Sequence, residues 1–123
     1  MATADRPRLL VVIRHTPYGS SIARASLDAA LAAAAFDQPI QVLFLGDGVL
    51  QLVPGQDSSA IGVRNIGRLL GSFPLYDIEH VYIDEEAAGR LGVDPSEAPL
   101  PTRPVNAAAI HALMDSCDHL LSF

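Results

Sequence analysis

The chain has 123 residues, half of them hydrophobic, and a net charge of −6, which suits a single domain (residues 1–123) with a sizeable core. The acidic balance argues against direct binding to nucleic acid, which needs clustered positive charge. All eight basic residues are arginine, so mechanisms that depend on a lysine are excluded, and the single cysteine, Cys117, excludes an internal disulfide framework.

The first half of the chain is predicted to hold two strands and two helices. The run LLVVI (9–13) has the continuous apolar character of a strand that is buried on both faces, and IQVLFL (40–45) repeats it. The Ala-rich segment 21–36 is predicted to form a helix between them, with serines at its start as caps. Residues 58–73 are predicted to form a second serine-capped helix, although their glycines weaken helix propensity.

The second half is predicted to hold two or three strands and two helices. HVYID (80–84) is predicted to be a strand, and EEAAGRLGV (85–93) a short helix. The Pro-rich connector 94–104 leaves room for a short edge strand, and a helix (105–117) and a final strand (118–123) follow it. Because strands alternate with helices, the sequence predicts a single-domain three-layer α/β fold with a mostly parallel sheet of about five strands.

Ligands of open parallel sheets gather at the carboxyl ends of the strands. HTPYGSS (15–21) lies at one such end, where backbone N–H groups can hold an anion. It matches neither of the Gly-rich phosphate motifs, so we interpret it as a capped turn. His15 has no cysteine nucleophile near it in the sequence, and we assign it a hydrogen-bonding or interface role.

The segment GDGVLQLVPGQ (46–56) carries apolar residues where a loop is expected. Asp47 has two open interpretations, a catalytic carboxylate or a turn residue that bonds its own backbone. The apolar residues either fold inward or contact another subunit, because exposed apolar patches mark interfaces. We expect a subunit interface, with the inward alternative kept open, for four residues: Val49, Leu50, Leu52 and Val53.

Carboxylates gather where the third strand meets the following helix. Asp84, Glu85 and Glu86 are residue types that ligate Mg²⁺, but the helix dipole also favours acidic residues in a first turn. Residues 77–97 hold seven carboxylates against one arginine, a local charge of −6. Because no phosphate loop or lysine accompanies them, we predict no metal site. A surface of this charge repels an anionic thiolate or persulfide.

Cys117 is predicted to lie at the end of the last helix, beside Asp118. Reactive cysteines sit near helix N-termini or cations, which stabilise the thiolate. A helix C-terminus beside a carboxylate does the opposite. We therefore predict that Cys117 is a buried structural thiol.

Three stretches, TPYGSSIARASLDAALAAAAF, VLFLGDGVLQLVPGQ and LYDIEHVYIDEEAAGRLGV, resemble the TusC/DsrF family, which belongs to the DsrE/DsrF/DsrH group of small sulfur-relay proteins. The resemblance runs in order through nearly the whole chain. Its most specific parts are the block D-G-V-x-Q-L-x-P-G-Q and the LYDIE that precedes the third strand. It implies a small α/β fold with a parallel-type sheet.

The resemblance also implies a function and partners. TusC-like chains assemble with TusB-like and TusD-like chains into a heterohexamer with two copies of each. That complex passes persulfide sulfur between carrier proteins towards 2-thiouridine at the tRNA wobble position. In sulfur-oxidising bacteria, DsrE, DsrF and DsrH form the corresponding complex.

The sulfur-carrying cysteine of these complexes belongs to the TusD/DsrE-type subunit, near the end of the third strand and the following helix. Here that region reads VYIDEEAAGRLGV and contains no cysteine, and Cys117 is not at the matching place. The resemblance therefore implies a non-catalytic subunit without catalytic, cofactor-binding or metal-binding residues, which touches neither tRNA nor membrane.

Two alternatives stay open. One is a small flavodoxin-like phosphate-binding or metal-binding enzyme that uses Asp47, Asp84 and Glu85 with a divalent cation. The other is that Cys117 itself carries sulfur. No apolar run approaches the roughly 20 residues of a membrane span, and the polar MATADRPR does not resemble a signal peptide, so we expect a cytoplasmic location.

Overall fold

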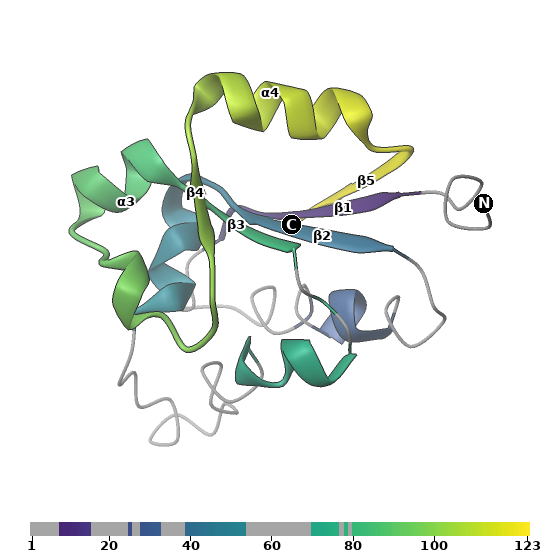
Figure 1. Cartoon of the computed structure of the whole chain (residues 1–123), viewed down its shortest axis with the longest axis horizontal. Helices are drawn as coiled ribbons and strands as arrows, with labels where there is room; N and C mark the ends of the chain where they lie inside the picture. The colour runs from purple at the N-terminus through teal and green to yellow at the C-terminus, as the bar shows by residue number, and fades with distance from the viewer. Residues whose placement is uncertain are drawn as a thin grey trace.

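A computed structural model of the chain describes residues 8–15, 25, 28–32, 39–53, 70–76, 78 and 80–123. Its centre is one sheet with helical segments on both faces (Figure 1). Residues 25, 28–32 and 70–71 are helical, as expected for the two helices of the first half. The serines proposed as their caps lie outside the described residues.

All five strands of the sheet run parallel, which confirms the predicted α/β class. Their spatial order is β4-β3-β2-β1-β5, so the chain adds strands on one side of β1 and then returns to its other side. The strands are β1 (Leu9–Ile13), β2 (Ile40–Phe44), β3 (His80–Asp84), β4 (Arg103–Val105) and β5 (His119–Ser122).

The connector before the last helix differs from the prediction at its end. It does contain an edge strand, β4, but this strand reaches Val105, and α4 (Ala107–Ser116) begins two residues later than predicted. The reason is Asn106, whose side chain accepts a hydrogen bond from the N–H of Ala109 at 2.9 Å and so caps the helix. Pro104 fits β4 because an edge strand tolerates a missing backbone donor.

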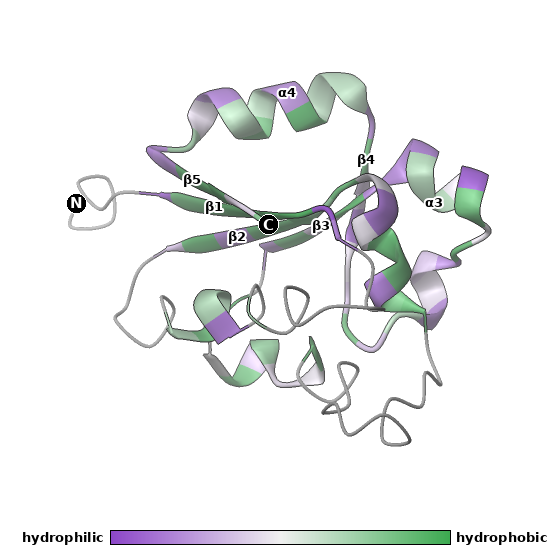
Figure 2. Cartoon of the chain, turned by 180° about the vertical axis from the view of Figure 1, so that it is seen from behind, coloured by the Kyte–Doolittle hydropathy of each residue, from purple (hydrophilic) through white to green (hydrophobic). Residues whose placement is uncertain are grey.

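The core lies on both faces of the sheet, because side chains alternate along each strand. On one face, α4 covers a smaller cluster of strand residues: Leu10, Val12, Leu43, Tyr82 and Val105. On the other face, Val11, Ile13, Val42, Phe44 and Ile83 pack against residues from the rest of the chain, among them Phe73 and Leu70. Each fully buried side chain of this size contributes about 1.5–3 kcal/mol, and Figure 2 shows the resulting apolar strands.

Four shorter helical segments complete the description. They are the 3₁₀ helix η2 (Gly46–Leu52), the 3₁₀ helix η4 (Phe73–Tyr76), the α-helix α3 (Glu85–Leu91) and the 3₁₀ helix η5 (Pro95–Glu97). Gly92 follows α3 in the left-handed region, with φ at 71°, and ends it, since glycine adopts this conformation without strain. Within the described part of the chain, no helix is long and apolar enough to cross a membrane.

Candidate functional site

The carboxyl ends of β2 and β3 meet around the carboxylate of Asp84. Asp84 is the last residue of β3, only 8% exposed, and the N-cap of α3. Its Oδ1 accepts from the N–H of Ala87 at 3.3 Å, and its Oδ2 accepts from the N–H of Gly46 at 3.1 Å. The carboxylate therefore joins the start of α3 to the turn after β2, and both its oxygens are already engaged.

Two glycines allow the backbone after β2 to follow this path. Gly46 has a φ of 56°, in the left-handed region that side chains disfavour. Gly48 packs against the end of β1, where an added Cβ would lie 1.9 Å from the carbonyl oxygen of Ile13. That same oxygen accepts a hydrogen bond from the N–H of Leu45 at 2.9 Å, so the backbone around it is held on both sides.

The apolar residues of η2 correct part of the interface prediction. Val49 and Leu52 are fully buried and belong to this chain's own core, so they leave no side-chain surface for another subunit. The inward alternative holds for these two because η2 folds back against the sheet and α3. Leu50 and Val53 are half-buried and pack at the edge of the same core, and a subunit contact through them stays a prediction.

Gln51 is a site residue that the sequence reasoning did not single out. It is 1% exposed, and its Nε2 donates to the carbonyl oxygen of His15 at 2.9 Å. Its Oε1 is buried and has no hydrogen-bond partner among the described residues. A lone polar residue inside an apolar block was the available signal. His15 itself is exposed, and the remainder of HTPYGSS, residues 16–21, lies outside the described residues.

The carboxylates of the metal-enzyme alternative do not converge. Asp47 and Glu85 are exposed, and Asp84 is committed to two backbone N–H groups. Glu86 instead pairs with Arg90 one turn along α3, at 3.5 Å on the surface. Among the described residues, no group of three His, Cys, Asp or Glu side chains is placed to hold a metal ion. The geometry therefore fits helix capping better than chelation.

The carboxyl group of Asp94, the N-cap of η5, ionises more readily than an ordinary aspartate. Its Oδ1 accepts from the Ser96 hydroxyl at 2.7 Å and from the Ser96 N–H at 2.9 Å, and these two bonds lower the pKa of Asp94. Because the pKa of Asp94 is lower in the folded than in the unfolded chain, its ionised form stabilises the fold at pH values above the unfolded-state pKa. This stabilisation is lost as the pH falls through the folded-state pKa.

Ser96→Ala is therefore expected to raise the pKa of Asp94 towards its ordinary value, because the hydroxyl donor is lost. Titration of the aspartate carboxyl carbons by NMR measures this shift. The same titration of the parent chain is the control. An unchanged pKa for Asp94 in the variant would contradict the assignment to Ser96.

Cys117 lies at the opposite end of the sheet from Asp84. It follows α4, and the next residue, Asp118, donates its N–H to the carbonyl oxygen of Arg8, just before β1. The Cys117 thiol donates to the carbonyl oxygen of Met114 at 3.2 Å, and its side chain packs, partly buried, against the cluster under α4. This position agrees with a structural thiol, although it is less buried than predicted.

Comparisons with known proteins agree with this geometry. The model of the DsrE/DsrF-like family matches residues 8–123. Proteins named "Protein TusC homolog" from Vibrio vulnificus (strain CMCP6) and Vibrio parahaemolyticus are each 34% identical over 116 residues, which cover 94% of this chain and 98% of theirs.

A solved structure supports the fold independently. The crystal structure of the ychN protein from E. coli aligns with a TM-score of 0.83 over 95% of this chain and 99% of that one. The two sequences are 18% identical, so this likeness concerns the fold alone. The family match and the TusC homologues show which family the chain is related to, and they agree with the resemblance drawn from the sequence. The chain therefore belongs to the DsrE/DsrF-like family.

Proposed function

We propose that this chain is a non-catalytic subunit of a TusBCD-type sulfur-relay complex that serves 2-thiouridine formation at the tRNA wobble position. The likeness to TusC homologues along 94% of the chain supports a sulfur-relay role. The observation that carries the non-catalytic part is Asp84, a buried carboxylate at the end of β3 with both oxygens bound by backbone N–H groups. The resemblance puts the sulfur-carrying cysteine of the TusD-like sibling in this region.

The chemistry at Asp84 supports the proposal that the sibling, and not this chain, carries the sulfur. A persulfide or thiolate is anionic, and a neighbouring carboxylate disfavours the charged form. The α3 N-terminus, which is a good place for a reactive thiolate, is already capped by Asp84. Cys117 lies at the other end of the sheet, beside the C-terminus of α4. The role left to this chain is to hold and shield the active sibling and to help dock its sulfur carriers.

Cys117→Ser is expected to leave sulfur transfer intact. The complex is assembled from this chain with TusB-like and TusD-like siblings, loaded with a cysteine desulfurase and cysteine, and followed by mass spectrometry of each subunit. The persulfide should appear on the sibling at the same rate with either residue at position 117. A persulfide on Cys117 of the purified chain, formed and passed on without siblings, would contradict the proposal.

Leu50→Asp is expected to prevent assembly with the siblings, because Leu50 is half-buried at the rim of η2 and a carboxylate there cannot enter an apolar contact. Size-exclusion chromatography of the co-expressed subunits measures this loss. Leu31→Asp is the matched control, since Leu31 is also half-buried at the edge of the same core. Circular dichroism checks that both variants keep the fold; equal assembly by both would remove Leu50 from the interface.

The description of the matching family names both DsrE and DsrF. A DsrEFH-type role in sulfur oxidation is therefore the second candidate function. Deletion of the gene separates the two. Loss of 2-thiouridine from hydrolysed tRNA, measured by mass spectrometry, supports the wobble-position role. Normal 2-thiouridine together with impaired oxidation of stored sulfur supports the second candidate and contradicts the first.

A further inference from the structure

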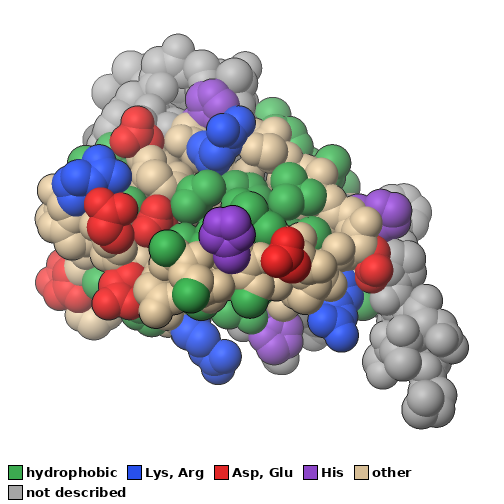
Figure 3. Space-filling view, turned by 90° about the horizontal axis from the view of Figure 1, so that it is seen from above, with side chains coloured by type: hydrophobic (Ala, Val, Ile, Leu, Met, Phe, Trp, Pro, Cys, Tyr) green, Lys and Arg blue, Asp and Glu red, His purple; other side chains and the backbone are tan. Residues whose placement is uncertain are grey.

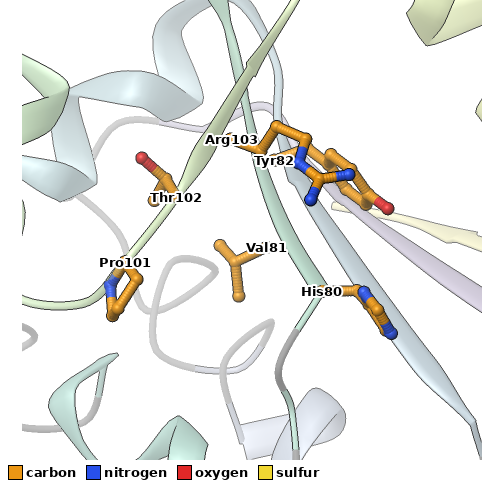
Figure 4. Close-up of a pocket in the computed structure, with 6 residues that line it drawn as sticks. All are labelled: His80, Val81, Tyr82, Pro101, Thr102 and Arg103. Carbon is orange, nitrogen blue, oxygen red and sulfur yellow. The ribbon is translucent and has the colours of Figure 1, made fainter.

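A small cavity lies at the fork where β3 and β4 begin to pair. The two strands are in register from Tyr82 and Arg103 onward, and the residues before these diverge. The space between them measures about 170 Å³. Its lining comes from two short runs of the chain (Figure 4): His80, Val81, Tyr82, Pro101, Thr102 and Arg103.

The polar groups at this cavity are positive or neutral donors. His80, Tyr82 and Arg103 lie on one face of the sheet because side chains alternate along the strands. Figure 4 shows the guanidinium, imidazole and phenol groups turned to the same side, while the Thr102 hydroxyl turns away from them. Val81 and Pro101 line the cavity with carbon.

Arg103 is exposed, and within the described part of the chain no carboxylate or other acceptor contacts it. Arg90 of α3, in contrast, is paired with Glu86. Arg103 keeps its hydrogen-bond donors free for a ligand.

Carboxylates also lie close to the fork in the sequence, since Asp77 and Glu79 come just before His80. Asp84, Glu85 and Glu86 lie at the carboxyl ends of the strands, whereas His80 and Arg103 begin β3 and β4. Figure 3 shows most acidic side chains on the left of the molecule and others towards the right, with arginine and histidine side chains spread between the top, the centre and the lower rim. The attraction for an anion at the fork therefore comes from the Arg103 guanidinium itself and not from the net charge of the region.

We propose that this cavity binds a carboxylate carried on a short aliphatic stem. Arg103 offers a planar pair of N–H donors that matches a carboxylate, with His80 on the same face of the sheet, and the stem lies in the space between the two strands, next to Pro101. A cavity of about 150 Å³ holds a benzene molecule, so this one has room for the carbons of a glutamate side chain. The carboxylate comes either from a glutamate of a partner protein or from a free small dicarboxylate.

Titration of the ¹⁵N-labelled full chain with glutarate, followed by NMR, tests the proposal. We expect saturable shifts of the backbone N–H signals of Val81, Tyr82 and Arg103, with a dissociation constant in the millimolar range. Uncharged glutaramide should cause none. Arg103→Gln should weaken binding at least tenfold, and Arg90→Gln, a change of the same kind on α3, should not. Where the chain is obtained only with its siblings, the same titration uses the complex with this chain labelled.

Two tripeptides with blocked termini distinguish a partner's glutamate from a free dicarboxylate. One has glutamate between two glycines, and the other has glutamine there. Binding of the glutamate peptide at least as tightly as glutarate assigns the cavity to a partner's side chain, and binding of glutarate alone assigns it to a free dicarboxylate. Either result supports a carboxylate site. Non-saturable shifts with both, or equal binding by Arg103→Gln, would overturn it. Neither outcome bears on the sulfur-relay role, which is tested with siblings and desulfurase.

Discussion

Gly48→Ala is expected to destabilise the chain by about 3 kcal/mol or more, or to prevent it from folding. The new methyl group would lie 1.9 Å from the carbonyl oxygen and 2.7 Å from the carbonyl carbon of Ile13. Both are backbone atoms at the buried end of β1, so neither can swing aside as a flexible side chain does. Denaturant unfolding of the variant and the parent chain measures the difference.

Gly89→Ala is the matched control for this substitution. Gly89 lies inside α3, and a Cβ placed there meets nothing within 4 Å. Alanine forms helix more readily than glycine, so this variant should gain about 0.5–1 kcal/mol. A Gly48→Ala chain that unfolds at the same denaturant concentration as the parent would show that η2 does not pack against β1 as described.

Asp84→Ala is expected to cost about 2–3 kcal/mol of stability. The change removes both acceptors at once, and the N–H groups of Gly46 and Ala87 then lose their partners in a buried place. Asp84→Asn should fall between alanine and the parent, because the two N–H groups are bound by different oxygens of Asp84 and a carboxamide places an acceptor at only one of these positions. Thermal and denaturant unfolding measure the series.

Asn106→Ala is the comparison that isolates the second bond of Asp84. Asn106 caps α4 through one hydrogen bond, to the N–H of Ala109, and it is exposed. Its loss should cost about 1 kcal/mol, as for an ordinary N-cap. If Asp84→Ala cost no more than this, the link from Asp84 to Gly46 would contribute nothing, and Asp84 would be a simple helix cap.

The sheet was predictable because each buried strand is a short, continuous apolar run such as 9–13 or 40–45. A run of this kind can be recognised from neighbouring residues alone, and its alternation with helical segments then predicts a parallel sheet. The boundary of α4 was missed by two residues, since Asn106 acts as a cap only where the chain turns after β4. Propensity alone does not place such a turn.

The site was less predictable because its defining contacts join distant residues. Asp84 was recognised as a helix-start carboxylate, but its bond to Gly46 spans 38 residues. The inward direction of Val49 and Leu52 depends on a 3₁₀ helix that packs beneath β2, and neither the helical nor the strand period predicts that. Gln51 likewise acquires its role from the carbonyl oxygen of His15.

Strand β5 has a consequence for how the protein behaves when it is made alone. It lies at one end of the sheet, where β1 is its neighbour among the described strands, and its Leu120 and Leu121 are 43% and 42% exposed. It holds no lysine, proline or inward charge of the kind that discourages strands from adding to an open edge. Concentrated solutions of the isolated chain should therefore self-associate first through β5, and its yield should improve when other subunits are produced with it.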